Sequence, residues 1–363
     1  MSTWYKVLGR CMVALAAILI ASRATVASAV SITAGVGAVL NGSDYAYAFV
    51  VGSDGNLWLN TNDGGFRWVN LSKPSTASIS YSVGVINAGG NPYEFVVGSD
   101  GNLWLNNWNG SGWPWTNMGT PSGVRIDGAV GAVTSSGNPW AAIVGSDGNV
   151  WAKYYNGSSW VWGEVGHPTS GAGVAKGLGV VEWVGTEPDV WVVDSAGNVW
   201  SALWNGSSWT WLKEGPPSSG GIGSSLGAFV AGPTSDSEHQ YASVLGSAGN
   251  LWLIAAIAGE DDWTNLGSPS GGVTLTKAVG AIDDEGVFPI YLYTIASNGH
   301  FFSDEDNGEW SGLADHGLTP TGYAFDIPVG VLLASPYPWA YMTAADGNLW
   351  YWNGSAFTSL GAP

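Results

Sequence analysis

Short apolar runs alternate with turn-forming residues along the chain from Ser31 to its end. In one representative copy of this pattern the four runs are Ser82–Asn87, Tyr93–Gly98, Leu103–Trp108 and Trp113–Met118. The turns between them are Gly89-Gly90-Asn91-Pro92, Ser99-Asp100-Gly101-Asn102 and Asn109-Gly110-Ser111. Because Gly, Asn and Asp accept positive φ, such turns are typical of β-hairpins. Each copy is therefore predicted to form four short antiparallel strands, and no segment shows a helical period.

This four-strand unit is repeated seven times. The segment Gly52–Trp58 recurs as Gly98–Trp104 and Gly145–Trp151, and weaker copies end at Trp200, Trp252, Phe301 and Trp350. A second aromatic series follows the first with the same period: Trp68, Trp115, Trp162, Trp211, Trp263, Trp310 and Phe357. Successive copies are 46 to 52 residues apart. Seven four-stranded units predict an all-β fold, a seven-bladed β-propeller, because radial repetition of such sheets buries both of their faces.

The two ends of the repeat region indicate how the ring closes. A solenoid with the same period would need capping repeats, and neither end resembles one. The first unit begins with a complete inner strand over residues 31–40, and the last ends with a complete outer strand over residues 357–360. We therefore expect the last blade to pack against the first without an exchanged strand.

The first 29 residues have the pattern of a secretory signal peptide. Lys6 and Arg10 precede an apolar run from Cys11 to Ala21, and small residues lead to a cleavage site after Ala29. The apolar run is shorter than the ~20 residues needed to span a bilayer. The sequence thus predicts residues 1–29 as a signal peptide, residues 30–363 as a single propeller domain, and a secreted protein without membrane insertion. The only cysteine, Cys11, leaves with the signal peptide, so no disulfide is expected.

Charge narrows the partners that the domain can bind. After Lys6, Arg10 and Arg23 are removed, seven basic residues face 28 acidic ones, a formal charge of −21. Such a field repels nucleic acid and anionic membrane surfaces. Charged residues make up only 10% of the chain, whereas tryptophan occurs 23 times. The composition therefore favours a partner recognised through aromatic and uncharged polar groups.

Residues shared by all copies are explained by the fold, and functional residues are expected where the copies differ. The Asp54, Asp100, Asp147 and Asp346 series is compatible with calcium ligands or simply with Asp-Gly turns. The third hairpin differs more informatively, because only three copies flank it with two aromatics: Trp108-Asn109-Gly110-Ser111-Gly112-Trp113, Tyr155-Asn156-Gly157-Ser158-Ser159-Trp160 and Trp204-Asn205-Gly206-Ser207-Ser208-Trp209. At the position of Trp113, later copies have Asp261, Gly308 and Ser355.

Further aromatics are expected on the same face of the ring as these hairpins, because the first and third turns of each blade emerge together. They open the second strands: Tyr47, Tyr93, Trp140, Tyr241, Tyr291 and Trp339, with Asp189 in the remaining copy. Flat aromatic faces beside amide and hydroxyl groups suit neutral sugars. The candidate ligand-binding residues are therefore Trp108, Asn109, Trp113, Tyr155, Asn156, Trp160, Trp204, Asn205, Trp209, Tyr93 and Trp140. The alternative is that they only close hairpins and pack the outer strands.

Together, the Gly-Ser-Asp-Gly-Asn-Leu-Trp and Trp-Asn-Gly-Ser-Ser-Trp units resemble the bacterial seven-bladed propeller lectins of the PLL type. The resemblance covers essentially residues 31–363 and implies fucose-type sugar binding in pockets between blades. Blades 5 and 6 depart from the pattern over residues 258–262 and 304–308, so seven equal sites are not expected. The resemblance implies a non-catalytic lectin with glycan or glycoconjugate partners, and we expect no cofactor and no metal site.

Two other functions remain open at this stage. Asp-Gly-Asn-Leu-Trp is also similar to the repeat of streptogramin lyases, which are metal-assisted propeller enzymes that use converging His and Glu. The four histidines, His167, His239, His300 and His316, show no paired His–Glu spacing of that kind. The second alternative is an extracellular interaction scaffold without a small ligand. Oligomeric state and the identity of the sugar are not encoded in these patterns.

Overall fold

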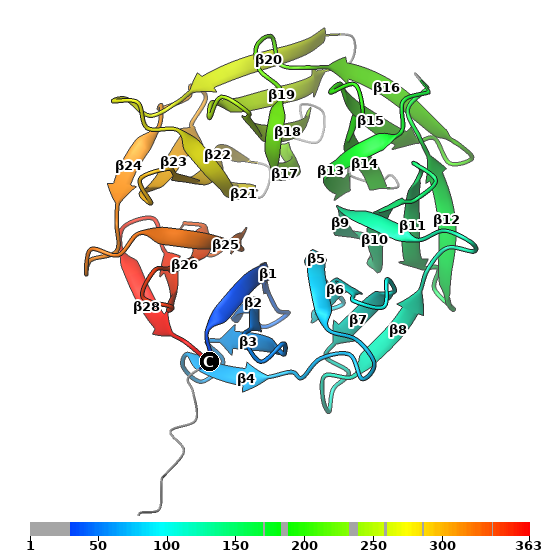
Figure 1. Cartoon of the computed structure of the whole chain (residues 1–363), viewed down its shortest axis with the longest axis horizontal. Coiled ribbons are helices and arrows are strands. Elements are labelled where there is room, and N and C mark those ends of the chain that lie inside the picture. Colours follow the sequence, from blue (N-terminus) through cyan, green and yellow to red (C-terminus); the bar gives the residue numbers. More distant parts are fainter. Residues whose placement is uncertain are drawn as a thin grey trace, which may run out of the picture.

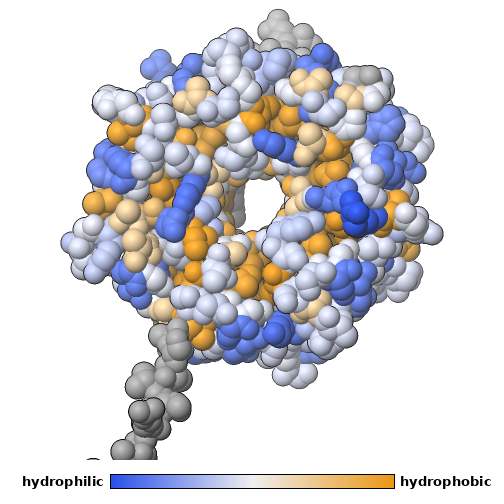
Figure 2. Space-filling view, viewed as in Figure 1, coloured by the Kyte–Doolittle hydropathy of each residue, from blue (hydrophilic) through white to orange (hydrophobic). Residues whose placement is uncertain are grey.

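The computed structural model describes residues 30–169, 171–182, 188–231, 239–257, 260–284, 287–335 and 337–363. The predicted signal peptide, residues 1–29, lies outside the described residues. Figure 1 shows seven sheets arranged around a central axis, and Figure 2 shows the opening at the centre of the ring. No helix among the described residues has the length and apolarity required to cross a bilayer.

Each sheet, or blade, consists of four antiparallel strands that are consecutive in the chain. The strands of blades 1 to 4 are β1 (Ile32–Leu40), β2 (Ala46–Gly52), β3 (Leu57–Thr61), β4 (Arg67–Asn70), β5 (Ile79–Ala88), β6 (Asn91–Gly98), β7 (Leu103–Asn107), β8 (Trp115–Gly119), β9 (Ile126–Ser135), β10 (Asn138–Gly145), β11 (Val150–Tyr155), β12 (Trp160–Gly166), β13 (Val174–Glu182), β14 (Pro188–Asp194), β15 (Val199–Trp204) and β16 (Trp209–Gly215). Those of blades 5 to 7 are β17 (Ile222–Ala231), β18 (His239–Gly246), β19 (Leu251–Ile257), β20 (Glu260–Gly267), β21 (Leu275–Asp284), β22 (Val287–Ala296), β23 (Phe301–Asp306), β24 (Ala314–Gly317), β25 (Phe325–Leu332), β26 (Trp339–Ala344), β27 (Leu349–Trp352) and β28 (Phe357–Gly361). The predicted all-β seven-bladed propeller is confirmed.

The ring closes as predicted, with no strand exchanged between blades. Strands β25–β28 form one complete sheet and β1–β4 another. The Trp68 indole of blade 1 donates a hydrogen bond to the Leu360 carbonyl of blade 7, at 3.2 Å. Figure 1 shows the C-terminus beside β4. The closing interface therefore consists of side-chain packing and a hydrogen bond rather than strand exchange.

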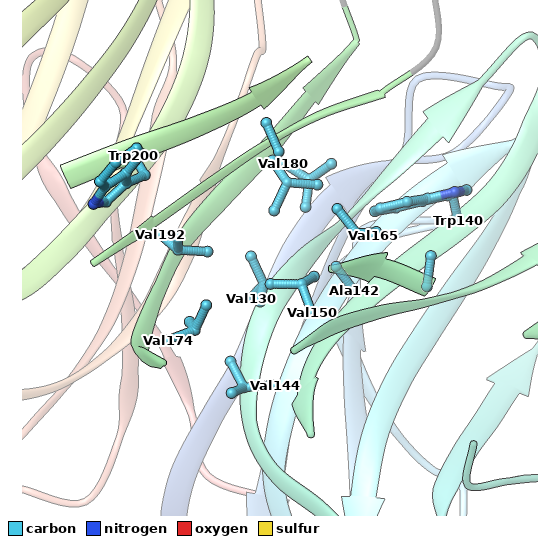
Figure 3. Packing of buried hydrophobic residues seen from close by; sticks show 13 residues of the cluster. Val130, Trp140, Ala142, Val144, Val150, Val165, Val174, Val180, Val192 and Trp200 are labelled. Atoms are coloured by element: carbon cyan, nitrogen blue, oxygen red, sulfur yellow. The ribbon is translucent and has the colours of Figure 1, made fainter. Parts of the chain in front are cut away.

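Apolar side chains fill the spaces between neighbouring blades. Seven hydrophobic clusters occur among the described residues, and each combines side chains from two adjacent blades. The second strands are buried on both faces, which explains their continuous apolar runs. Figure 3 shows the cluster between blades 3 and 4, with Trp140 at one edge and Trp200 at another.

The inner strands approach one another closely because they carry glycine. A Cβ atom on Gly35 of β1 would lie 2.1 Å from the Pro328 carbonyl oxygen of β25. A Cβ on Gly177 of β13 would lie 2.3 Å from the Val130 Cα of β9. Neither position can hold a side chain without moving the neighbouring backbone.

The outer strands are joined by a repeated indole hydrogen bond. Besides Trp68, the indoles of Trp115, Trp162 and Trp263 each donate to a backbone carbonyl of the preceding blade, at 3.0 to 3.3 Å. The predicted structural role of this aromatic series is thereby explained for four blades. Such a bond contributes about 1 kcal/mol when its donor is shielded from water.

The Asp-Gly turns stabilise themselves. The Asp54 carboxylate accepts hydrogen bonds from the Asn56 backbone and amide nitrogens and from the Trp58 indole, at 2.8 to 3.3 Å. Asp100, Asp147 and Asp346 do the same in their blades. In blade 4, Asp194 reaches its indole, that of Trp200, from two residues earlier in the turn. These contacts support the turn interpretation of the Asp series over the calcium interpretation.

Three residue assignments in blade 6 were wrong because the register of its strands differs from the one inferred by counting residues. Thr294 pairs with Phe302, as Val244 pairs with Trp252 in blade 5, so Phe302 and not Phe301 is the counterpart of the first tryptophan series. Trp310 lies outside the outer strand, in an isolated bridge to Asp306. Ser303 pairs with Ala314 as Leu105 pairs with Thr116 in blade 2, so Ser311, not Gly308, occupies the position of Trp113. The error arose because Phe301 and Phe302 are both aromatic and the hairpin that follows differs in length.

Candidate functional site

The third hairpins of blades 2, 3 and 4 are rigid. In blade 2 the Asn109 side-chain oxygen accepts hydrogen bonds from Ser111 N, Ser111 Oγ and Gly112 N, at 2.9 to 3.0 Å. Asn156 and Asn205 make the same three contacts in blades 3 and 4. The amide oxygens of these candidate residues are therefore used to close the hairpin. The hairpin in turn holds the aromatic residue on each side of it in a fixed place.

The flanking aromatics contact each other across each hairpin. Their ring centroids are 5.5 Å apart for Trp108 and Trp113, 5.7 Å for Tyr155 and Trp160, and 5.2 Å for Trp204 and Trp209. All three pairs are tilted or edge-to-face, a favourable geometry for aromatic side chains. Each pair is half-buried, so part of its surface faces solvent.

The second ring of each pair reaches the preceding blade. Trp113 lies 6.2 Å from Tyr47 and Trp209 lies 6.4 Å from Trp140. Trp160 contacts Phe95 at 6.0 Å and belongs to the same cluster as Tyr93. The predicted site residues are thus brought together in three groups, at the interfaces between blades 1 and 2, 2 and 3, and 3 and 4. Burial and the nearby Tyr155 raise the pKa of Tyr93, so its phenol is neutral at physiological pH.

The group between blades 3 and 4 encloses a hollow of about 270 Å³. Its aromatic lining residues come from both blades and are Trp140, Tyr154, Trp204 and Trp209. Glu164 also lines the hollow. We call this hollow the aromatic hollow. Tyr154 fits because Gly163 on the neighbouring strand has no side chain, and a Cβ there would lie 3.1 Å from the Tyr154 ring.

Tyr154 was missed in the sequence because the neighbouring copies of the repeat have no aromatic residue at its position. At the corresponding position blade 2 has Asn107 and blade 4 has Leu203, as the strand registers show. The signal that could have found it is the combination of an aromatic there with glycine at position 163, where the other blades have a side chain. Both features are unique to blade 3.

A fourth aromatic group lies between blades 7 and 1. Phe66, which is 41% exposed, contacts Tyr351 at 5.5 Å and Trp339 at 6.5 Å, and Trp339 contacts Tyr351 at 4.7 Å. Phe66 takes the position of Trp113 in blade 1. Phe66 was missed because the third hairpin of blade 1 is one residue shorter than that of blade 2. When the two blades are aligned by counting residues from the first tryptophan, Phe66 therefore does not fall on Trp113.

The remaining interfaces are closed by other contacts. Between blades 4 and 5, the Trp191 indole donates to Gln240, which donates to the buried Asp189 carboxylate. Burial raises the pKa of Asp189 to about 6. In the cluster between blades 5 and 6, Tyr241 stacks on Phe229 of its own blade at 5.4 Å. In the cluster between blades 6 and 7, Tyr291 stacks on Tyr293 of its own blade at 6.1 Å. Among the described residues of these interfaces, no aromatic residue of a third hairpin contacts the residue that begins the second strand of the preceding blade.

The histidines do not converge. They lie on three different blades: His167 on blade 3, His239 on blade 5, and His300 and His316 on blade 6. His300 pairs with Asp315 at 3.0 Å, and His316 bonds the Ser303 hydroxyl at 2.7 Å. Burial lowers the pKa of His316. In the part of the chain that the structure describes, no three potential metal ligands form a group.

Comparison with known proteins gives a likeness of fold. Neither a protein-family model nor a curated protein sequence matches the chain. Among solved structures, the BP39L lectin from Burkholderia pseudomallei is 17% identical with a TM-score of 0.58, over 91% of this chain and 97% of that one. AofleA from Arthrobotrys oligospora is 12% identical with a TM-score of 0.54, over 83% and 88% of the two chains. A fucose-specific lectin from Aleuria aurantia is 17% identical with a TM-score of 0.50, over 75% and 92%. The predicted resemblance to propeller lectins is confirmed as a likeness of fold.

Proposed function

We propose that this protein is a non-catalytic lectin that binds neutral, fucose-type glycans at aromatic groups between its blades. The observation that carries the proposal is the aromatic hollow between blades 3 and 4. Its four aromatic side chains come from two blades, and its volume is close to the lower end of small-ligand sites, about 300 Å³. An aromatic face can stack on the C–H face of a pyranose while hydroxyl and amide groups bond its hydroxyls.

The structural neighbours support the same ligand class. One of them is a fucose-specific lectin and another is described as a lectin, and both match most of this chain. The chain's strong negative charge disfavours acidic ligands, whereas a neutral sugar is indifferent to it. Glycans and glycoconjugates are therefore the partners we propose.

Repetition of the aromatic groups suits weak, multivalent binding. One stacked ring and a few hydrogen bonds support dissociation constants of roughly millimolar to micromolar. Four groups on the hairpin face of one molecule would raise avidity for a dense glycan surface by about 10²-fold or more.

A substitution at Trp209 tests the proposal. Trp209→Ala removes one wall of the aromatic hollow and should weaken binding to a fucosylated surface by about tenfold or more, measured by surface plasmon resonance. The matched control is Leu212→Ala on the same strand, because Leu212 is 44% exposed and does not line the hollow. Circular dichroism and thermal melts check that both variants fold. Equal binding by folded Trp209→Ala and wild type would assign these aromatics to packing alone.

We also propose that the protein is secreted. The proposal is supported by the basic start, the apolar run from Cys11 to Ala21 and the small residues before Ala29. Expression of the full chain in a secreting host, followed by intact-mass analysis, should give a protein beginning at Val30. Recovery of an uncleaved chain in the cytoplasm would contradict it.

A further inference from the structure

A second hollow of about 240 Å³ lies beside the aromatic one, on the hairpin face of blade 3. The two hollows share Trp140 and Tyr154, which pair directly across strands β10 and β11. The first turn of blade 3 and the start of its third turn form the rest of the second hollow. Its polar lining residues are Ser135, Ser136, Asn138 and Asn156. We call it the polar hollow.

The polar hollow presents hydrogen-bonding groups that the protein itself does not use. Within the described residues, the hydroxyls of Ser135 and Ser136 and the side-chain oxygen of Asn138 have no hydrogen-bond partner. The Asn156 oxygen is used to close its hairpin, but its amide nitrogen is not. Donors and acceptors are thus both available, which is what the hydroxyl groups of a sugar require.

The rim of this hollow is held in place by the next blade. Ser136 has a φ of 48°, a left-handed conformation that is unusual for a residue other than glycine. Its backbone N–H donates to the Glu182 carboxylate of blade 4, at 2.7 Å. The turn that carries Ser135 and Ser136 is therefore fixed relative to blade 4, which also supplies two of the four aromatic side chains of the aromatic hollow.

We infer that the two hollows form one extended site that accepts a neutral disaccharide or a longer glycan, an inference that rests on the proposed lectin function. The terminal sugar stacks in the aromatic hollow and the next sugar bonds the free groups of the polar hollow. Each hollow alone falls below the ~300 Å³ typical of small-ligand sites, whereas the two together exceed it. Glu164 borders one hollow and Glu182 supports the rim of the other, so an acidic second sugar is disfavoured.

The test compares a monosaccharide with a disaccharide at this one site. Protein labelled with 5-fluorotryptophan is titrated with methyl α-fucoside and with the methyl glycoside of fucosyl-α1,6-N-acetylglucosamine. The ¹⁹F resonance of Trp140, assigned with Trp140→Phe, reports binding at the shared wall. Two additional hydrogen bonds should make the disaccharide bind about tenfold more tightly than the monosaccharide.

Substitutions in the polar hollow should reduce only this disaccharide advantage. Asn138→Ala removes a free acceptor, and Ser136→Gly removes a hydroxyl while favouring the left-handed turn. Each should lower the advantage about threefold and leave monosaccharide affinity unchanged. The matched control is Asn91→Ala, because Asn91 makes the same turn contact in blade 2, to Gly89 O, as Asn138 makes to Ser136 O.

The outcomes separate this inference from the proposed function. Equal affinity for both sugars, or a disaccharide advantage that Asn138→Ala and Ser136→Gly leave intact, would overturn the extended site while keeping the lectin. If neither sugar shifts the Trp140 resonance, the proposed function fails at this interface and the extended site fails with it. Loss of the advantage in both variants and its retention in Asn91→Ala would support the extended site.

Discussion

Asp189→Asn should stabilise the protein above pH 6 and leave its stability nearly unchanged near pH 4. Asp189 opens the second strand of blade 4, where the other six blades have an aromatic residue. Its carboxylate is only 5% exposed and accepts hydrogen bonds from the Gln240 amide and the Trp204 backbone. Burial nevertheless dominates, and the pKa of Asp189 rises from 3.8 to about 6. Asparagine resembles the protonated carboxyl in shape and carries no charge at any pH.

The size of the effect follows from this pKa. A raised carboxyl pKa means that the folded state binds the proton more tightly than the unfolded state. The wild type therefore loses stability as pH rises from the unfolded pKa to the folded one, and the loss is complete above it. Two pKa units correspond to about 3 kcal/mol. The difference between Asp189→Asn and wild type should grow by about that amount from pH 4 to pH 7 and then level off.

Urea denaturation of both proteins at several pH values from 4 to 8, followed by tryptophan fluorescence, measures this difference. The control is Asp127→Asn, because the hydrogen bond from Arg125 lowers the pKa of the exposed Asp127. Asp127→Asn should therefore become slightly less stable relative to wild type as pH rises. The pH dependence of this difference has the opposite sign to that of Asp189→Asn. A free-energy difference for Asp189→Asn that does not vary with pH would show that the carboxyl stays charged and solvated in the folded protein.

Three further predictions concern the turns, the core and the site. Ala248→Asp supplies the carboxylate that blade 5 lacks beside the Trp252 indole. It should raise the free energy of unfolding, measured by urea denaturation, by about 1–2 kcal/mol. An unchanged urea midpoint would contradict the stabilising role assigned to the Asp-Gly turns. Trp104→Ala removes a 5% exposed indole bonded to Asp100 and should lower the free energy of unfolding by about 3–5 kcal/mol. Sugar binding should change less than about twofold between low and high salt, because the proposed contacts are uncharged; a steep salt dependence by titration calorimetry would point to a charged ligand.

The fold could be predicted because its signals are local and repeated. Each turn depends on Asp, Asn and Gly within four residues, and seven copies average out individual deviations. In blade 2 the expected strand Leu103–Trp108 and the observed strand Leu103–Asn107 differ by one residue. The register failed only in blade 6, where two adjacent phenylalanines made the local signal ambiguous.

The site could be predicted only in part because it is formed across blades. The hairpin aromatics were visible as differences between copies, but their contacts join residues far apart in sequence, such as Trp209 and Trp140. Tyr154 required knowledge that Gly163 leaves room beside it, and Phe66 required the register of a shorter hairpin. The period of the sequence repeat gives neither the space between side chains nor the register of a shortened hairpin.

Buried polar groups were the least predictable feature. Glu94 is completely buried in β6, opposite Asn106, and neither carboxyl oxygen has a hydrogen-bond partner among the described residues. Burial raises its pKa well above the usual value. Glu94 lies between Tyr93 and Phe95 in a strand, so alternation of apolar and polar residues would predict that it faces solvent. That prediction requires one face of the strand to be exposed. In a propeller both faces are covered, so the alternation rule fails there.

The distribution of aromatic groups follows from how the ring is held together. An indole bond to the preceding blade occurs in blade 5 and a self-capped turn in blade 7, although neither blade has an aromatic residue at the position of Trp113. The third hairpin is therefore free to vary, and its aromatic form occurs in blades 1 to 4, which places four groups at consecutive interfaces from 7/1 to 3/4. Under the proposed lectin function, a continuous arc of these groups on one face would engage neighbouring glycans of a single surface at the same time, whereas the same four groups scattered on both faces could not.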